Sequence, residues 1–250
     1  MHILVTNDDG VTAPGLAALA QAMRALGRVT VVAPDHNWSA SGHVKTMHKP
    51  LRVKKAALAD GAEALATDGA PSDCVALAFL GVVPDKIDMV VSGINPFANM
   101  SHDVTYSGTV TAAMEGAIAR VPAVAVSVDG AATAGYETAA WAAARVVSRV
   151  AERGLPPYTL LNVNVPRVAV SDVKGFRITR QGLRVYRDAL VERADPRGVP
   201  YYWIGGEAPT GVPDEGTDFA ALADGYVSVT PLRLDLTAYD LLEPLREWTL

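Results

Sequence analysis

Two adjacent acidic residues have types and spacing that suit metal chemistry. Asp8 and Asp9 follow the apolar run 3–5 after two polar residues, and Gly10 after them permits a sharp turn of the backbone. Neighbouring carboxylates repel each other, and a divalent cation bound by hard oxygen ligands relieves that repulsion. The alternative is that both acids are solvated or cap a loop. Because the pair stands at the end of a predicted strand, we favour a cation site.

Neutral oxygen donors follow the next two predicted strands. Ser39 lies in the long polar segment 34–43, and Asn95 ends the segment 92–95. Ligands of an open parallel sheet bind outside the carboxyl ends of its strands, so we expect these side chains near the two aspartates. Small polar residues also form ordinary loops, so Ser39 alone is a weak signal.

The run Ser107-Gly108-Thr109 stands at a predicted helix start. Free backbone N–H groups and the positive end of the helix dipole favour an anion there, and the glycine allows a phosphate to approach closely. The alternative is that Ser107 or Thr109 only caps the helix. A cap alone does not predict carboxylates at a neighbouring strand end, so the combination indicates a phosphate site.

The remaining reactive residues suggest little other chemistry. All five histidines lie within the first 102 residues, and no pair has the spacing of a helical zinc motif. His102 is a candidate proton donor without further support. Cys74 falls in an apolar helical pattern, which predicts a packing role rather than a nucleophile. The sequence lacks the patterns of serine hydrolases, Walker-type NTPases and dinucleotide dehydrogenases.

Alternating short apolar runs and alanine-rich helical patterns must position these residues. This alternation over the first two thirds predicts an α/β fold with a parallel sheet covered on both faces. The predicted strands are 3–5, 29–32, 87–91, 124–126 and 160–165, and the predicted helices are 14–26, 71–80, 109–119 and 133–150.

The last third has a different pattern, rich in arginine with scattered aromatic residues. An extended hairpin is predicted over 173–202, then a loop over 209–217, a strand over 225–229 and a terminal helix over 239–248. An aromatic arm of this kind often contacts another subunit, and an ordinary surface hairpin is equally compatible. We therefore expect an α/β core over residues 1–170 with the metal and phosphate site, and an oligomerisation arm over 171–250.

Composition excludes several classes of protein. The 250 residues are 50% hydrophobic and 20% charged, which suits a large globular domain and argues against disorder. The net charge of −5 argues against general binding to nucleic-acid backbone but not against one bound nucleotide. The start has no basic leader, and the apolar run 75–84 is about half the length of a membrane span. We expect a cytoplasmic protein without membrane contact.

Several spaced motifs together resemble the SurE family of stationary-phase survival nucleotidases. The resembling segments keep a consistent order along nearly the whole chain: 3–10 with 14–16, 33–35 with Ser39, 70–75, 92–95, 106–110, 113–116, 161–166 and 225–232. The resemblance implies a Rossmann-like three-layer sandwich with a mostly parallel sheet and a C-terminal extended hairpin.

The family resemblance also implies a function. It implies a metal-dependent phosphomonoesterase that hydrolyses nucleoside 5′- and 3′-monophosphates with one Mg²⁺ or Mn²⁺ per subunit. It further implies a cytoplasmic homodimer or homotetramer formed through an exchanged C-terminal arm. From the charges of the site, rather than from the resemblance, we expect Asp9 to help to position the attacking water and Asp8 to be mainly a ligand. The implied metal ligands are Asp8, Asp9, Ser39 and Asn95, and the implied phosphate-binding residues are Asn99, Ser107, Gly108 and Thr109.

One segment departs from the family pattern. The family usually has Asn-x-Gly-x-Asn where this chain has Asn-Pro-Phe-Ala-Asn over 95–99. Phe97 in place of the glycine, next to Pro96, stiffens and crowds the loop. The departure bears on substrate preference and turnover rather than on the metal site.

Three other hypotheses remain open. Asp8 or Asp9 could itself attack phosphorus and form an aspartyl phosphate, although such enzymes usually separate two aspartates by one residue. The chain could be a non-catalytic module that binds metal and nucleotide. It could also be a broad phosphate-ester or short-polyphosphate phosphatase, which differs only in what the outer pocket accepts.

Overall fold

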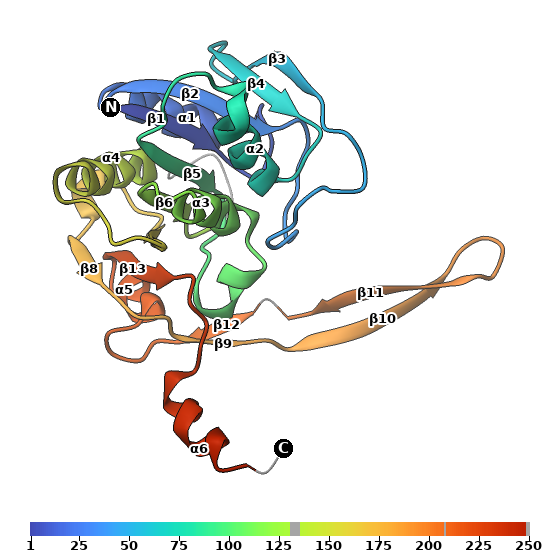
Figure 1. The fold of residues 1–250 in the computed structure, drawn as a ribbon. Helices are drawn as coiled ribbons and strands as arrows, with labels where there is room; N and C mark the ends of the chain where they lie inside the picture. Colours follow the sequence, from blue (N-terminus) through green and yellow to red (C-terminus); the bar gives the residue numbers. More distant parts are fainter. Residues whose placement is uncertain (131–135, 208, 249–250) are drawn as a thin grey trace.

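A nine-stranded sheet organises the chain in the computed structural model, which describes residues 1–130, 136–207 and 209–248. The strands in spatial order are β3 (Val53–Ala57), β4 (Glu63–Thr67), β2 (Arg28–Pro34), β1 (His2–Thr6), β5 (Met89–Asn95), β6 (Ala123–Val128), β7 (Thr159–Val165), β13 (Val227–Arg233) and β8 (Phe176–Ile178). Six of the pairings are parallel, and β3–β4 and β7–β13 are antiparallel. The predicted mostly parallel sheet is confirmed (Figure 1).

Helices cover both faces of this sheet and complete three layers. The helices α1 (Pro14–Arg24) and α4 (Tyr136–Arg153) pack on one face, and α2 (Pro71–Leu77) and α3 (Gly108–Ile118) pack on the other. Successive residues of a strand point to opposite faces, so a strand buried on both sides must be apolar throughout. In β1, for example, Ile3 and Val5 belong to the core under α1 and α4, whereas Leu4 belongs to the core under α2 and α3.

Some element boundaries differ from those expected. The helix predicted over 71–80 ends at Leu77 and continues as a π-helical turn, Ala78–Val82. The third predicted strand extends to Asn95, so this residue ends β5 instead of following it. The predicted start of α4 at Thr133 lies outside the described residues.

Several elements were not expected from the sequence. The strand β3 is buried at no position, and the apolar run of β4 is only the three residues 64–66. The short helix α5 (Asp218–Ala223) lies between the predicted loop and the predicted strand near the C-terminus. These elements are only partly buried or very short, so hydrophobic periodicity gives little signal for them.

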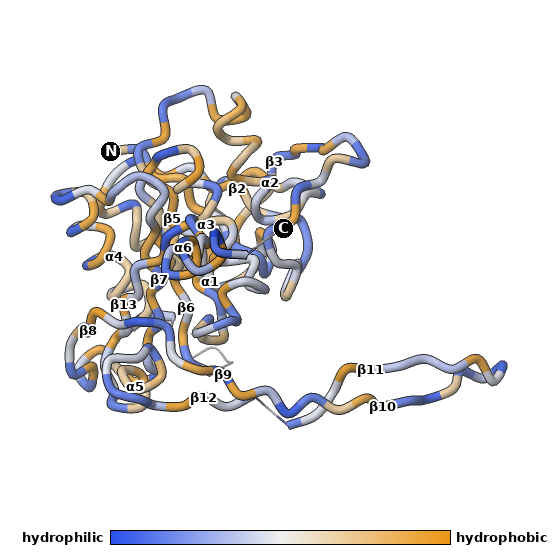
Figure 2. Tube along the Cα trace, turned by 60° about the horizontal axis from the view of Figure 1, so that its bottom comes forward, coloured by the Kyte–Doolittle hydropathy of each residue, from blue (hydrophilic) through white to orange (hydrophobic). Residues whose placement is uncertain are grey.

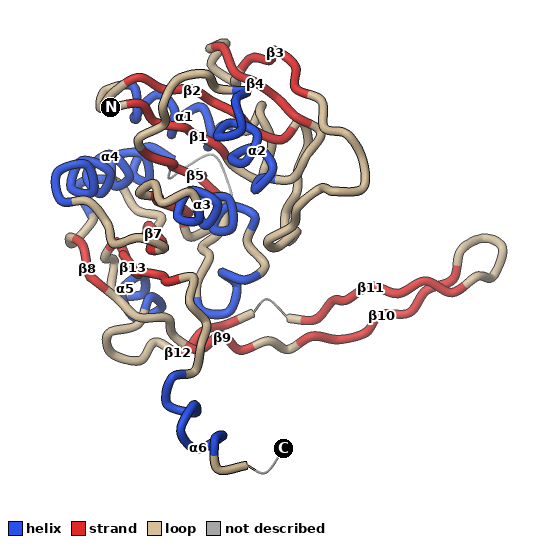
Figure 3. Tube along the Cα trace, viewed as in Figure 1, coloured by secondary structure: helices blue, strands red, loops and turns tan. Residues whose placement is uncertain are grey.

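A hairpin is present as predicted and projects from the body as an arm, but it spans 183–212 rather than 173–202, because residues 176–178 form β8 of the central sheet (Figures 1 and 3). Its strands β10 (Asp188–Ala194) and β11 (Pro200–Gly206) are antiparallel, and the pair β9 (Leu183–Val185) and β12 (Thr210–Val212) forms its base. Part of the loop predicted over 209–217 is therefore strand. Polar and apolar residues mix along the arm, whereas apolar residues concentrate in the central strands (Figure 2).

The C-terminal segment also stands away from the body (Figure 1). It forms a 3₁₀ turn, Tyr239–Leu241, followed by the short helix α6 (Leu242–Arg246), in place of the single helix expected over 239–248. No helix among the described residues has the length and apolar character needed to cross a membrane.

Candidate functional site

The carboxyl ends of β1 and β5 bring the predicted metal ligands to one edge of the sheet. The two strands are parallel neighbours, and Thr6 lies opposite Ser92. Asp8 lies two residues after Thr6, just beyond the end of β1, and Asn95 lies three residues after Ser92, at the end of β5. The two residues therefore stand at the ends of adjacent strands. The backbone N–H of Trp38 donates to the Asp8 carbonyl at 2.8 Å, which places the segment carrying Ser39 beside them. Ser39 itself is exposed.

The start of α3 contacts Asp8 directly. The Thr109 hydroxyl donates to Asp8 Oδ1 at 2.5 Å. A Cβ added at Gly108 would lie 2.6 Å from the Asp8 Cβ, so only glycine permits this approach. Ser107 accepts a hydrogen bond from the Val110 N–H at 3.1 Å and is the N-cap of the helix. The predicted anion site and the aspartates are thus adjacent, with Ser107 capping the helix and the Thr109 hydroxyl bonded to Asp8.

Both aspartates resist ionisation in this position. Burial raises the pKa of Asp8, and burial followed by the charge of Asp8 raises the pKa of Asp9 to about 7. Burial and the charge of Asp9 also raise the pKa of Tyr136, at the start of α4. A nearby positive charge lowers the pKa of a carboxyl group, so a bound cation would counter the raised pKa values of both aspartates.

The donor atoms around the pair fit a hard divalent cation. The Asn95 side-chain nitrogen donates to the Phe97 carbonyl at 2.5 Å, which leaves the Asn95 Oδ1 atom as its ligating atom. Asn7 Oδ1 is buried without a hydrogen-bond partner in the described part of the chain. No group of three or more His, Cys, Asp or Glu residues within the described ranges has metal-binding geometry. A cation here would therefore need neutral oxygens beside the two carboxylates, and Mg²⁺ or Mn²⁺ accepts such ligands.

Asn99 is held by side chains of β6 and β7. Its backbone N–H donates to Asn164 Oδ1 at 2.8 Å, and its carbonyl accepts from the amides of Asn162 and Asn164 at 2.7 and 3.0 Å. Its own side-chain nitrogen donates to the Ser127 hydroxyl at 2.8 Å. The sequence reasoning assigned no role to these partners, although two asparagines in the apolar strand 159–165 were an available signal.

A buried glutamate anchors the loop that follows β2. Glu115 on α3 pairs with His43 Nε2 and Lys45 Nζ, each at 2.7 Å. Burial raises the pKa of Glu115, but hydrogen bonds from His43 and Lys45 outweigh burial and hold this pKa below its usual value. The sequence reasoning missed this contact because its partners are about 70 residues apart. The candidate proton donor His102 is exposed, so its role stays a hypothesis.

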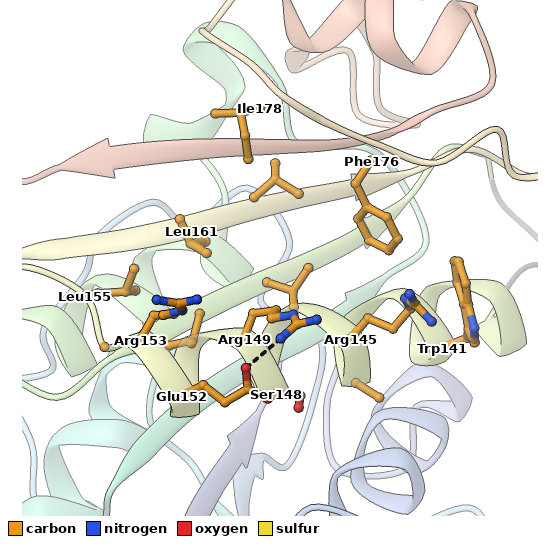
Figure 4. A pocket seen from close by; sticks show the side chains of 15 residues that line it. Trp141, Arg145, Ser148, Arg149, Glu152, Arg153, Leu155, Leu161, Phe176 and Ile178 are labelled. Carbon is orange, nitrogen blue, oxygen red and sulfur yellow. Dashed lines mark hydrogen bonds and ion pairs between the residues drawn. The ribbon is translucent and has the colours of Figure 1, made fainter.

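A separate groove lies between α4 and the strands β7, β8 and β13 (Figure 4). Its volume is about 810 Å³, with an apolar wall that includes Leu161, Phe176 and Ile178. Arg145 and Arg149 on α4 line the facing side. None of the predicted site residues lines it, so the chemistry discussed here lies elsewhere.

Comparison with known proteins gives consistent matches over the chain. The family model described as "Survival protein SurE" matches residues 3–188. A 5′-nucleotidase SurE of Chloroflexus aggregans is 52% identical and covers 99% of both chains, and one of Herpetosiphon aurantiacus is 53% identical over 98% of this chain and 97% of that protein. The crystal structure of SurE protein from Aquifex aeolicus matches with a TM-score of 0.84 at 41% identity, covering 98% of each chain.

The first prediction concerns the contact between Gly108 and Asp8. Gly108→Ala would push Asp8 out of place, and we expect the dissociation constant for Mn²⁺ to rise at least about tenfold. Isothermal titration calorimetry measures this constant. The matched control is Gly205→Ala on β11, where the nearest contact of an added Cβ is an ordinary 3.4 Å. Equal Mn²⁺ affinity of Gly108→Ala and the wild type would contradict the arrangement.

The second prediction concerns the pH dependence of the metal-free chain. The raised pKa of Asp9 means that the folded state holds a proton that the unfolded state has released between about pH 4 and 7. Stability must therefore fall as pH rises through this window. We expect the melting temperature of the wild type to fall more steeply there than that of Asp9→Asn, and Mn²⁺ to reduce the difference. Thermal unfolding followed by circular dichroism measures the melting temperatures. Equal slopes of melting temperature against pH for the wild type and Asp9→Asn would refute the prediction.

Proposed function

This chain belongs to the SurE family, and from that premise we propose that it is a metal-dependent nucleotidase. It is a hydrolase that converts nucleoside monophosphates, both 5′ and 3′, to nucleoside and inorganic phosphate. The observation that supports this most directly is the contact of the α3 start with Asp8. The contact supports the proposal because the acid proposed to bind metal then lies beside the helix end proposed to bind phosphate.

The proposed cofactor is one Mg²⁺ or Mn²⁺ per subunit. Its ligands are the carboxylates of Asp8 and Asp9, the hydroxyl of Ser39 and the side-chain oxygen of Asn95. When bound, the cation supplies Lewis-acid polarisation of a phosphoryl oxygen and a water of lowered pKa. The raised pKa values of the two acids support this assignment, because a cation stabilises their ionised forms.

The protein groups then act on the phosphate and the water. A phosphate monoester dianion repels an attacking oxygen, so its charge must be neutralised before attack. The first backbone N–H groups of α3, from Gly108 and Thr109, and the amide of Asn99 bind the remaining phosphoryl oxygens, and Ser107 fixes that helix end by capping it. Asp9 orients the water, and Asp8 acts mainly as a ligand.

The third prediction tests the reaction itself. We expect phosphate release from AMP and GMP with added Mn²⁺ or Mg²⁺, abolition by a chelator, and a loss of about 100-fold or more in Asp9→Asn. The control is Asp172→Asn, an exposed acid in the 3₁₀ turn Val170–Asp172. A colorimetric phosphate assay measures the rates.

The same assay separates the competing hypotheses. Nucleotide binding without turnover would indicate a non-catalytic module and contradict the proposal. Faster release from a chromogenic ester or tripolyphosphate than from any nucleotide would favour the broader phosphatase. Labelled phosphate retained on the protein after an acid quench would favour an aspartyl phosphate. Phe97, at the centre of the departure from the family pattern, is exposed. Comparison of these substrates therefore also tests whether that departure changes substrate preference.

We also propose that residues 171–250 mediate self-association into a cytoplasmic homodimer or homotetramer, while residues 1–170 hold the metal and phosphate site. Large apolar side chains are exposed on the arm, among them Leu190, Tyr202, Trp203 and Ile204. A second exposed set follows β13 and consists of Leu236, Tyr239, Leu241, Leu242, Leu245 and Trp248. Exposed apolar groups of this extent indicate contact with another protein surface.

The fourth prediction concerns the second of these sets. Deletion of residues 237–250 removes most of it, so we expect a smaller mass in solution at equal concentration. A pair of substitutions, Leu241→Asp with Leu245→Asp, should act in the same direction. Light scattering measures the mass, and Leu80→Asp, at an exposed position on the body, is the control. An unchanged mass in both variants would refute this role of the terminal segment.

A further inference from the structure

The residues that lead into the arm contact the segment between Asn99 and Ser107. We call residues 181–186 the arm root. Ser101 is 1% exposed, and its polar groups all bond to the arm root or to α5. Its N–H donates to Asp218 Oδ2 at 3.0 Å, and its carbonyl accepts from the Gln181 amide at 2.8 Å. Its hydroxyl donates to the Gly182 carbonyl at 2.8 Å and accepts from the Arg184 N–H at 3.2 Å.

The backbone of Ser101 shows that these contacts impose a conformation. Its φ is +52°, in the left-handed region that residues other than glycine seldom adopt. A residue in this conformation is strained and persists where the surrounding contacts fix it. The path of the chain from Asn99 into the turn Ser101–Thr105 therefore depends on partners more than 80 residues away in sequence.

A charge pair adds a second contact two residues further on. Arg184 Nε lies 2.9 Å from Asp103 Oδ2, with both side chains less than one-fifth exposed. The Tyr186 hydroxyl donates to Asp103 Oδ1 at 2.5 Å. Burial, with the hydrogen bond to Asp103, raises the pKa of Tyr186 to about 12, so the hydroxyl keeps its proton at neutral pH. Arg184 Nε has no hydrogen-bond partner in the described part of the chain, so its contact with Asp103 is an ion pair, and the low solvent exposure of these two side chains strengthens their attraction.

Asp103 also bonds to the residues that lead into α3, and so it links the arm root to the proposed phosphate site. Its carbonyl accepts the N–H groups of Tyr106 and Ser107, each at 3.0 Å. Ser107 in turn caps α3 and precedes Gly108. On the other side, Asn99 lies two residues before Ser101. Both proposed phosphate-binding groups therefore lie at the ends of one short segment whose middle is bonded to the arm root.

We infer that Arg184 and Tyr186, through Asp103, are positioning residues of the proposed phosphate site. This inference rests on the proposed function and extends it, because it makes the base of the C-terminal arm part of the substrate-binding geometry. The arm root contributes no group that touches phosphate in this scheme. It sets where Asn99 and the start of α3 lie, and small displacements of such groups lower binding and rate substantially.

The fifth prediction tests this inference in the full-length chain with saturating Mn²⁺. Arg184→Gln and Tyr186→Phe remove the charge pair and the hydroxyl without large changes of volume. For the double variant we expect about a tenfold rise in KM for AMP and in the inhibition constant of inorganic phosphate, with a smaller change in kcat. Asp103→Asn should give the same pattern. When Asp103→Asn is combined with the arm-root substitutions, the rise in KM should be smaller than the product of the separate rises.

Matched controls separate positioning from general damage. Arg120→Gln and Tyr158→Phe make the same chemical changes at an exposed hydrogen-bonded pair on the body and should leave both constants at wild-type values. The Mn²⁺ dissociation constant and the mass in solution should also stay unchanged in the arm-root variants. Wild-type KM and phosphate inhibition in the double variant would overturn the inference. A loss that appears only together with a changed mass would overturn it as well, because the arm root would then act through assembly.

Direct binding keeps this test independent of turnover. Calorimetry with inorganic phosphate and Mn²⁺ compares the wild type with the double variant without any reaction. If the wild type binds phosphate but releases none from nucleotides, the proposed reaction fails, and weaker phosphate binding by the variant still supports the arm-root inference. Equal phosphate affinity in the two proteins would contradict the inference even if the enzyme is active.

Discussion

The repulsion between two adjacent carboxylates, one buried and one half-buried, is the interaction on which the rest of the site depends. Asp8 and Asp9 follow a strand at the centre of the sheet, where burial favours their neutral forms. A cation makes both charges tolerable, and the neighbouring amide and hydroxyl oxygens are suitable further ligands. The start of α3 approaches Asp8 through Gly108, so in the proposed site an anionic substrate would meet the cation and a helix end together.

The parallel sheet accounts for this convergence. Because β1, β2 and β5 run in the same direction, the segments that leave them begin at one edge. Those segments are long, however, and strand order alone does not fix them. Glu115 anchors the loop after β2, Asn162 and Asn164 hold Asn99, and the arm root holds Ser101 and Asp103. Each anchor joins a loop segment to another part of the fold through buried or half-buried polar contacts.

The C-terminal third is connected to the site in two ways. Its strands β13 and β8 extend the central sheet beyond β7. Its arm root contacts the segment that joins β5 to α3, while the arm itself projects outward with exposed aromatic side chains (Figure 1). The surface proposed for self-association and the segment that carries the proposed phosphate-binding residues are therefore joined by a few residues.

The sequence alone determined the alternation of strands and helices and the polar residues at the strand ends. Both are local, because side-chain periodicity and the residue that ends an apolar run can be read within about ten positions. The prediction of Asp8, Asp9, Asn95 and the α3 start as site candidates came from this information together with family resemblance. Only the tertiary structure decided how Asn99, Ser101 and Glu115 are held, and that β3 and β4 join the sheet. Their partners are distant along the chain or only half buried, so packing rather than local pattern sets those contacts.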